Sequence, residues 1–69
     1  MHAELIAIGS ELVLGEIVDT NSAQIARMLR GIGLAVARTT AIADDRPSIT
    51  RLGSEACARS PIVIMTGGL

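Results

Sequence analysis

The chain has 69 residues and a formal charge of −1, from six Arg and seven Asp or Glu, with no Lys. A chain of this length forms at most one domain, and it has neither aromatic residues for a core nor a second cysteine to pair with Cys57. No basic block points to nucleic acid, no apolar run approaches the ~18 residues of a membrane helix, and no secretory signal is evident. We therefore expect a cytoplasmic protein that binds neither nucleic acid nor a membrane.

Residues 3–8 are expected to form the first strand, because Leu5–Ile8 are continuously apolar, as in a strand buried on both faces of a parallel sheet. Residues 9–20 follow as a loop or irregular segment. This segment carries three acids and five large aliphatic residues, so part of it must pack against the rest of the chain.

A helix is predicted over about residues 22–32, where an apolar face recurs at i, i+3, i+4 and i+7. Asn21 is a favourable N-cap, with Gln24 placed as in a capping box. Met28 on the apolar face, like Met65 further on, is expected to fill the core rather than bind a metal.

Residues 34–42 are predicted as a second strand, which becomes polar towards its end and therefore suits the edge of a sheet. A turn leads into a second helix that ends near Arg59, with Asp44 or Asp45 as its cap and Pro47 in its first turn. On that helix the residues at 51, 55 and 59 are expected to form an exposed ion-pair ladder, and Cys57 to be buried or half-buried. No role is assigned to His2.

Residues 62–66 complete a β-α-β-α-β pattern, which predicts an α/β fold with parallel strands and right-handed crossovers. The first and third strands are the most apolar and should be neighbours, which gives the order 2-1-3. Parallel strands end at one edge of a sheet, so three segments should meet there, at the usual ligand crevice of such sheets. The segments are Gly9-Ser10-Glu11, Ala43-Asp44-Asp45 and Thr66-Gly67-Gly68.

Each of these segments has two interpretations. Thr66-Gly67-Gly68 can present a hydroxyl and backbone N–H groups to a phosphate, or it can be a simple tight turn. Asp44 can hold a divalent cation or polarise a water, or it can cap the helix, a role that suits Asp45 better. Glu11 can be a metal ligand or general base, or an exposed loop acid, and Asn21 is a cap first and a ligand contact second.

The stretch GSELVLGEIVDTN, residues 9–21, resembles a segment of the competence/damage-inducible CinA family, which is related to the molybdopterin-binding domains MoaB, MogA and MoeA. The acidic pair Asp44-Asp45 resembles the family's acidic segment before its second helix. IVIMTGGL, residues 62–69, resembles the strand that enters the family's Thr-Gly-Gly loop. The resemblance covers nearly all of the chain.

This resemblance implies a three-layer α/β/α domain about twice as long, of which residues 1–69 would be the N-terminal portion, ending inside the Thr-Gly-Gly loop. It implies binding of a nucleotide diphosphate or a pterin phosphate, and hydrolysis of ADP-ribose to AMP and ribose 5-phosphate with Mg²⁺ or Mn²⁺. A molybdopterin-binding module is the alternative. The whole protein is expected to be a homo-oligomer, and the 69-residue chain alone to be inactive and prone to associate through its third strand.

In the hydrolase interpretation Asp44 positions metal or water, and Glu11 is a second catalytic candidate. The ligand and its phosphates would be bound by Gly9, Ser10, Asn21, Thr66, Gly67 and Gly68.

Overall fold

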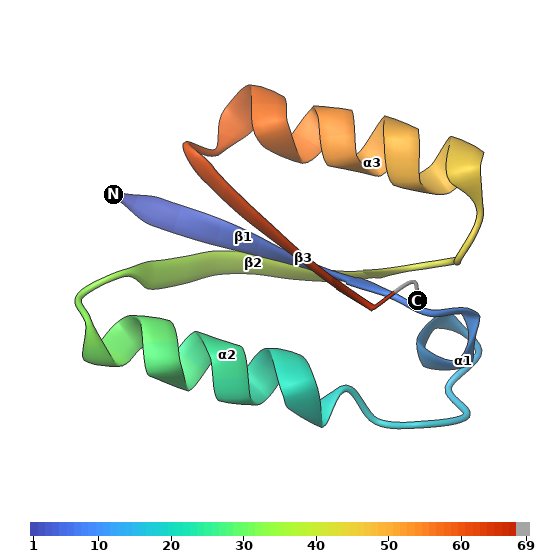
Figure 1. Ribbon diagram of the computed structural model, residues 1–69, viewed down its shortest axis with the longest axis horizontal. Helices are drawn as coiled ribbons and strands as arrows, with labels where there is room; N and C mark the ends of the chain where they lie inside the picture. Colours follow the sequence, from blue (N-terminus) through green and yellow to red (C-terminus); the bar gives the residue numbers. More distant parts are fainter. Residues whose placement is uncertain (68–69) are drawn as a thin grey trace.

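The computed structural model describes residues 1–67, and its elements confirm the predicted β-α-β-α-β order with one addition, a short helix after the first strand (Figure 1). In those residues no helix has both the length and the apolar character needed to cross a bilayer. The elements are β1 (His2–Ile8), α1 (Ser10–Val13), α2 (Thr20–Gly31), β2 (Ala35–Ile42), α3 (Arg46–Arg59) and β3 (Ile62–Gly67).

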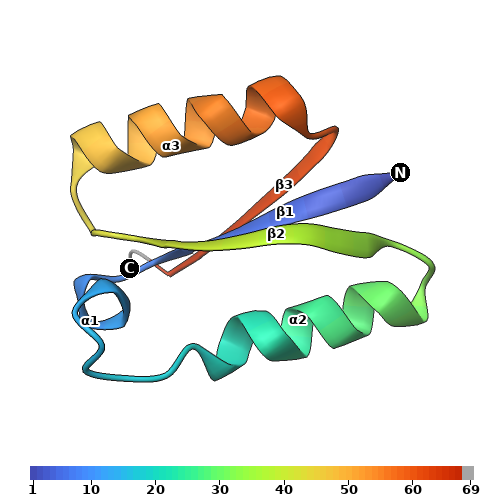
Figure 2. The ribbon, with the colours of Figure 1, turned by 180° about the vertical axis from the view of Figure 1, so that it is seen from behind.

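The three strands form a parallel sheet in the order β2-β1-β3, as the sequence predicted. Helices α2 and α3 lie on opposite sides of this sheet, which gives the three-layer α/β/α arrangement (Figures 1 and 2). The register of β1 with β2 shifts by one residue between Ala3 and Glu4, so that Glu4 lies opposite Arg38 rather than Ala37.

The core lies between the sheet and α3. Ile6 of β1, Ile42 of β2 and Ala56 of α3 are all at most 2% exposed. Half-buried aliphatic side chains surround them: Ile8, Ile49, Leu52 and Val63. On the opposite face of β1, Ala3, Leu5 and Ala7 are also buried. The central strand is therefore covered on both faces, as its continuous apolar run indicated.

The start of the first long helix differs from the prediction. Its N-cap is Asp19, whose Oδ1 accepts the backbone N–H of Ser22 at 3.0 Å, so Asn21 already lies inside the helix and the expected capping box with Gln24 does not form. Residues 10–13, expected as irregular, form one turn of helix instead. Two good cap residues stand two positions apart here, and local preference alone does not choose between them.

Several side chains expected in the interior are exposed. Met28 is 72% and Met65 43% exposed, and Cys57 is exposed on α3, so all three predictions were wrong. Helix α2 contacts the sheet mainly at β2. Consequently only part of its predicted apolar face is covered: Ile25 and Leu29 are half-buried, whereas Ile32 remains open.

An ionic cluster around the buried Glu4 joins the start of β1 to the end of α3. The Glu4 side chain is 3% exposed and accepts two hydrogen bonds from Arg59, from Nε at 2.8 Å and from Nη2 at 2.9 Å. Ser60 Oγ donates to the same carboxylate and lies 3.3 Å from His2 Nε2. Arg59 therefore pairs with Glu4 instead of forming the exposed ion-pair ladder expected on the helix. His2, to which no role was assigned, contacts Ser60. The hydrogen bonds from Arg59 and then Ser60 lower the pKa of Glu4 to about 2.

Replacing the buried acid, Glu4→Gln, is expected to destabilise the fold at neutral pH, because Arg59 would lose its charged partner. The folded pKa lies below the ordinary value of 4.5, so ionised Glu4 stabilises the fold fully above that pH, and this contribution is lost as the pH falls towards about 2. Denaturant unfolding of both proteins should show a difference that shrinks across this window.

The matched control is Glu55→Gln, which removes an exposed acid from the helix that carries Arg59. Such a surface change should alter the unfolding free energy by no more than about 0.5 kcal/mol. Equal losses for the two variants at neutral pH would show that the ionic cluster adds no stability.

Candidate functional site

The carboxyl ends of the three strands form one rim. Ile8 at the end of β1 lies opposite Ile42 of β2 on one side and Gly67 of β3 on the other. Just beyond the strands, the N–H of Gly9 donates to the carbonyl of Ile42 at 2.9 Å, and the N–H of Asp44 donates to Ser10 Oγ at 3.3 Å. The three segments that the sequence placed at one edge therefore do meet there.

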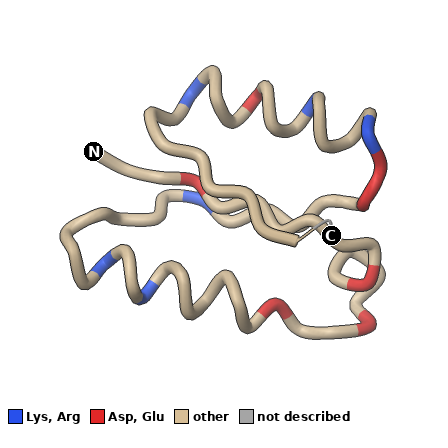
Figure 3. The backbone as a smooth tube through the Cα atoms, viewed as in Figure 1, with Lys and Arg blue, Asp and Glu red and all other residues tan. Residues whose placement is uncertain are grey.

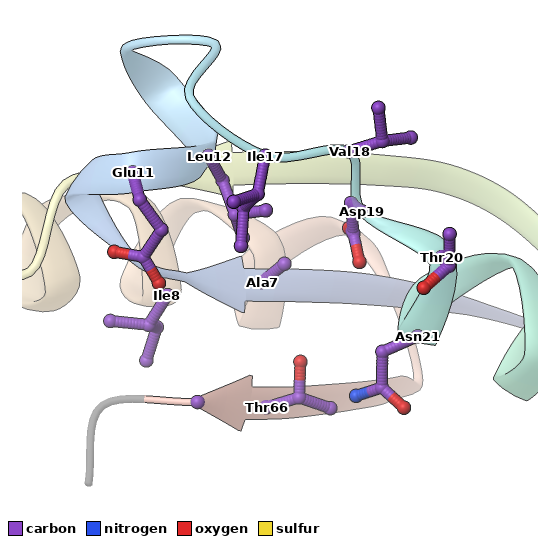
Figure 4. Close-up of a pocket in the computed structure, with 11 residues that line it drawn as sticks. Ala7, Ile8, Glu11, Leu12, Ile17, Val18, Asp19, Thr20, Asn21 and Thr66 are labelled. Carbon is purple, nitrogen blue, oxygen red and sulfur yellow. The ribbon is translucent and has the colours of Figure 1, made fainter.

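A pocket of about 220 Å³ opens on this rim, on the side of the sheet that faces α2 (Figure 4). In the close-up Leu12, Ile17 and Asp19 point from the segment above the sheet towards β1, and the hydroxyl of Thr66 points up from β3. Val18 points away from the pocket. The lining residues are Ala7, Ile8, Glu11, Leu12, Ile17, Val18, Asp19, Thr20, Asn21, Thr66 and Gly67.

Some of the predicted site residues share this pocket and others lie beside it. Glu11, Asn21, Thr66 and Gly67 line it. Ser10 and Asp44 are exposed and held together by their hydrogen bond, but they are not among the lining residues. Gly9 is buried, and its N–H is already engaged by β2. Gly68 lies outside the described residues.

Sequence reasoning missed Asp19 and the aliphatic pair Leu12 and Ile17 as pocket residues. The available signal was the mixture of acids and large aliphatic residues in 9–20, which indicated a packed segment without showing on which side of the sheet it packs. Figure 3 shows that acidic positions gather on α1 and on the segment that leads into α2.

The two neighbouring acids after β2 have separate roles. Asp45 is the N-cap of α3, with its Oδ1 accepting the N–H of Ser48 at 2.9 Å, and hydrogen bonds from Ser48 lower the pKa of Asp45. This confirms the capping interpretation for Asp45. Asp44 is exposed, and its side chain remains available for chemistry at the rim.

Within residues 1–67 no three His, Cys, Asp or Glu side chains come close enough together to hold a metal ion. Glu11 and Asp44 are the two residues at the rim that were predicted as metal ligands. Two carboxylates are fewer donors than a divalent cation usually takes from oxygen ligands. The described residues do not make a complete metal site, and we assign no chemical step to a metal held by them alone.

Gly67 fits its position because it has no side chain. Its φ is +84°, and a Cβ added there would lie 2.3 Å from the carbonyl oxygen of Ile8. Both the backbone conformation and the close approach of β1 therefore require glycine. This close approach brings the end of β3 against the floor of the pocket.

Residues 4–69 match the family model described as a probable molybdopterin binding domain. The chain is similar over its whole length to CinA-like proteins of Chlorobium phaeovibrioides, at 48% identity, and of Chlorobium chlorochromatii, at 46%. It spans 16% of the length of each of these two relatives.

The fold is similar to a crystal structure of the protein CinA from Thermoplasma acidophilum, which is described there as of unknown function. The TM-score is 0.91 at 34% sequence identity, over 99% of this chain and 40% of that one. The likeness therefore extends to the whole arrangement of strands and helices that forms the rim.

The variant Gly67→Ala should lose more stability than Gly33→Ala. Gly33 has nearly the same φ, +85°, but a Cβ there would meet nothing within 4 Å. Gly33→Ala should therefore lose only the free energy needed to hold alanine in the left-handed conformation, about 1–2 kcal/mol. Gly67→Ala adds the clash with Ile8. Chemical denaturation of the two variants gives the comparison, and equal losses would mean that β3 moves aside at no cost.

Proposed function

The chain belongs to the probable molybdopterin binding domain family and has CinA-like relatives, and on this basis we propose that the whole protein binds a nucleotide diphosphate at the rim and hydrolyses it. The proposed substrate is ADP-ribose. Water adds to one phosphorus and the bond between that phosphorus and the bridging oxygen breaks, which releases AMP and ribose 5-phosphate. Since the chain spans about one sixth of its curated relatives, further residues of the whole protein are expected to take part.

The observation that carries this proposal is the rim itself. Three parallel strands end together beside a pocket lined by Glu11, Asn21 and Thr66, and open α/β sheets bind their ligands at such strand ends. The pocket is smaller than the 300–1,000 Å³ that is usual for a whole drug-sized ligand. It suits one part of a dinucleotide-like molecule, with the remainder extending along the rim.

Asp44 is the proposed catalytic residue of this half of the site. It is exposed at the rim, its backbone is held by Ser10, and the neighbouring Asp45 is occupied as a helix cap. A carboxylate in that position can orient the attacking water and accept its proton. Glu11 lines the pocket, so we assign it to the ligand rather than to the water.

Pterin phosphate binding is the second candidate, favoured by the description of the matching family model. In that case the whole protein would be a molybdopterin-binding module, with the same pocket holding a pterin and little turnover. For either ligand we also propose a divalent cation, Mg²⁺ or Mn²⁺, whose binding site is completed by residues beyond those described. We further propose that the whole protein is homo-oligomeric and cytoplasmic.

The whole protein should release AMP and ribose 5-phosphate from ADP-ribose in the presence of Mg²⁺ or Mn²⁺, and Asp44→Asn should lower kcat about 100-fold or more, within the usual contribution of a general base. Asp45→Asn is the matched control, because asparagine still caps α3. Product release followed by chromatography gives the rates. An Asp44→Asn protein with unchanged kcat would remove Asp44 from the mechanism. Tight pterin binding without turnover would favour the second candidate.

A further inference from the structure

The rim pocket carries negative charge and no positive charge among its described lining residues. Glu11 and Asp19 are its two ionisable groups, and none of the eleven lining residues is Arg or His. A phosphate placed among them would face two carboxylates with no basic side chain among the described lining residues to offset the repulsion. The pocket is therefore a poor site for the charged part of a nucleotide or pterin phosphate.

The same carboxylates are well suited to hydrogen-bond donors. An ionised carboxylate only accepts, and a pair of neighbouring hydroxyl or ring N–H groups can bind its two oxygens together. Dinucleotide-binding proteins use an Asp or Glu in this way to hold ribose hydroxyls. Asp19 uses Oδ1 for the helix cap, and its carboxylate still points into the pocket from above β1 (Figure 4).

The remaining walls match a small ring. Leu12 and Ile17 point into the pocket opposite Ala7 and provide an aliphatic surface against which the face of a ring can pack (Figure 4). Asn21 and Thr66 add groups that both donate and accept at one side. A volume of about 220 Å³ has room for one ring system and not for a complete dinucleotide.

We propose that this pocket binds the uncharged ring of the ligand, with Glu11 and Asp19 accepting hydrogen bonds from adjacent donors on that ring, while the phosphates lie outside the pocket along the rim. The inference rests on the proposed function and deepens it. Two rings share the required chemistry: the ribose with its vicinal hydroxyls, and the pterin with its amino and ring N–H groups. The arrangement leaves Asp44 and Ser10 on the side where the phosphates would lie.

Calorimetric titration of the whole protein can separate the ring from the phosphate. The probes are adenosine, 2′,3′-dideoxyadenosine, a simple pterin without phosphate, and inorganic pyrophosphate with Mg²⁺. We expect adenosine or the pterin to bind, and Glu11→Gln and Asp19→Asn each to weaken that binding about tenfold. Pyrophosphate binding should stay unchanged or tighten in the same variants, because a nearby negative charge has been removed.

The variants are chosen to keep the fold. Asparagine at position 19 remains a good N-cap for α2, and thermal melts would show that the protein is intact. Glu16→Gln is the matched control, an exposed acid of the same segment that does not line the pocket, and it should leave all four affinities unchanged. Loss of binding to dideoxyadenosine would identify the ribose as the ring. Binding of the pterin without adenosine would identify the pterin.

The proposal fails if neither adenosine nor the pterin binds, or if Glu11→Gln and Asp19→Asn weaken pyrophosphate binding as much as ring binding. It also fails if they weaken neither. These results are independent of turnover. If the affinities change as expected but ADP-ribose is not hydrolysed, the proposed hydrolase is overturned and the ring pocket stands. If ADP-ribose is hydrolysed but the affinities do not change, the ring pocket is overturned and the hydrolase stands.

Discussion

Pairing of β1 with a parallel neighbour on each edge is the constraint on which the rest of the molecule depends. The helical crossovers that parallel pairing requires cover β1 on both faces, and all three strands end at the same edge of the sheet. Ser10, Asp44 and Gly67 are far apart in sequence, yet they meet because each follows or ends one of these strands. Antiparallel pairing at either edge would separate them.

Much of this arrangement could be predicted from the sequence. The apolar runs of β1 and β3, the polar end of β2 and the two helical patterns fix the element order, and parallel crossovers then leave few topologies. The contacts that could not be predicted are those decided by distance in space. Glu4 and Arg59 are 55 residues apart, and the i, i+4 spacing of Arg59 with Glu55 offered a plausible local partner instead. The choice of Asp19 over Asn21 as the cap likewise depends on how the preceding segment leads into α2.

The molecule separates its charged groups by function. At the amino ends of the strands, on the α3 face, the buried Glu4 carboxylate accepts hydrogen bonds from Arg59 and Ser60. At the carboxyl ends, on the α2 face, Glu11 and Asp19 line an open pocket without a basic partner there among the described residues. A buried acid paired with a cation is typical of a structural role, whereas acids without a basic partner in a pocket are available to a ligand.

The register shift at the start of β2 changes which positions of this strand face each helix. Val36 lies opposite Ala3, towards α2, whereas Arg38 and Ile42 lie opposite Glu4 and Ile8, towards α3, although all three positions are even-numbered. One additional residue, Ala37, reverses the alternation of the pleat between them. Insertions and deletions in this strand are therefore not equivalent to length changes in a surface loop. Losing Ala37 itself would restore the regular alternation and leave Ile42 opposite Ile8, whereas losing a residue between Arg38 and Ile42 would turn Ile42 out of the core and bring Ala41 in, with the strand itself still able to pair.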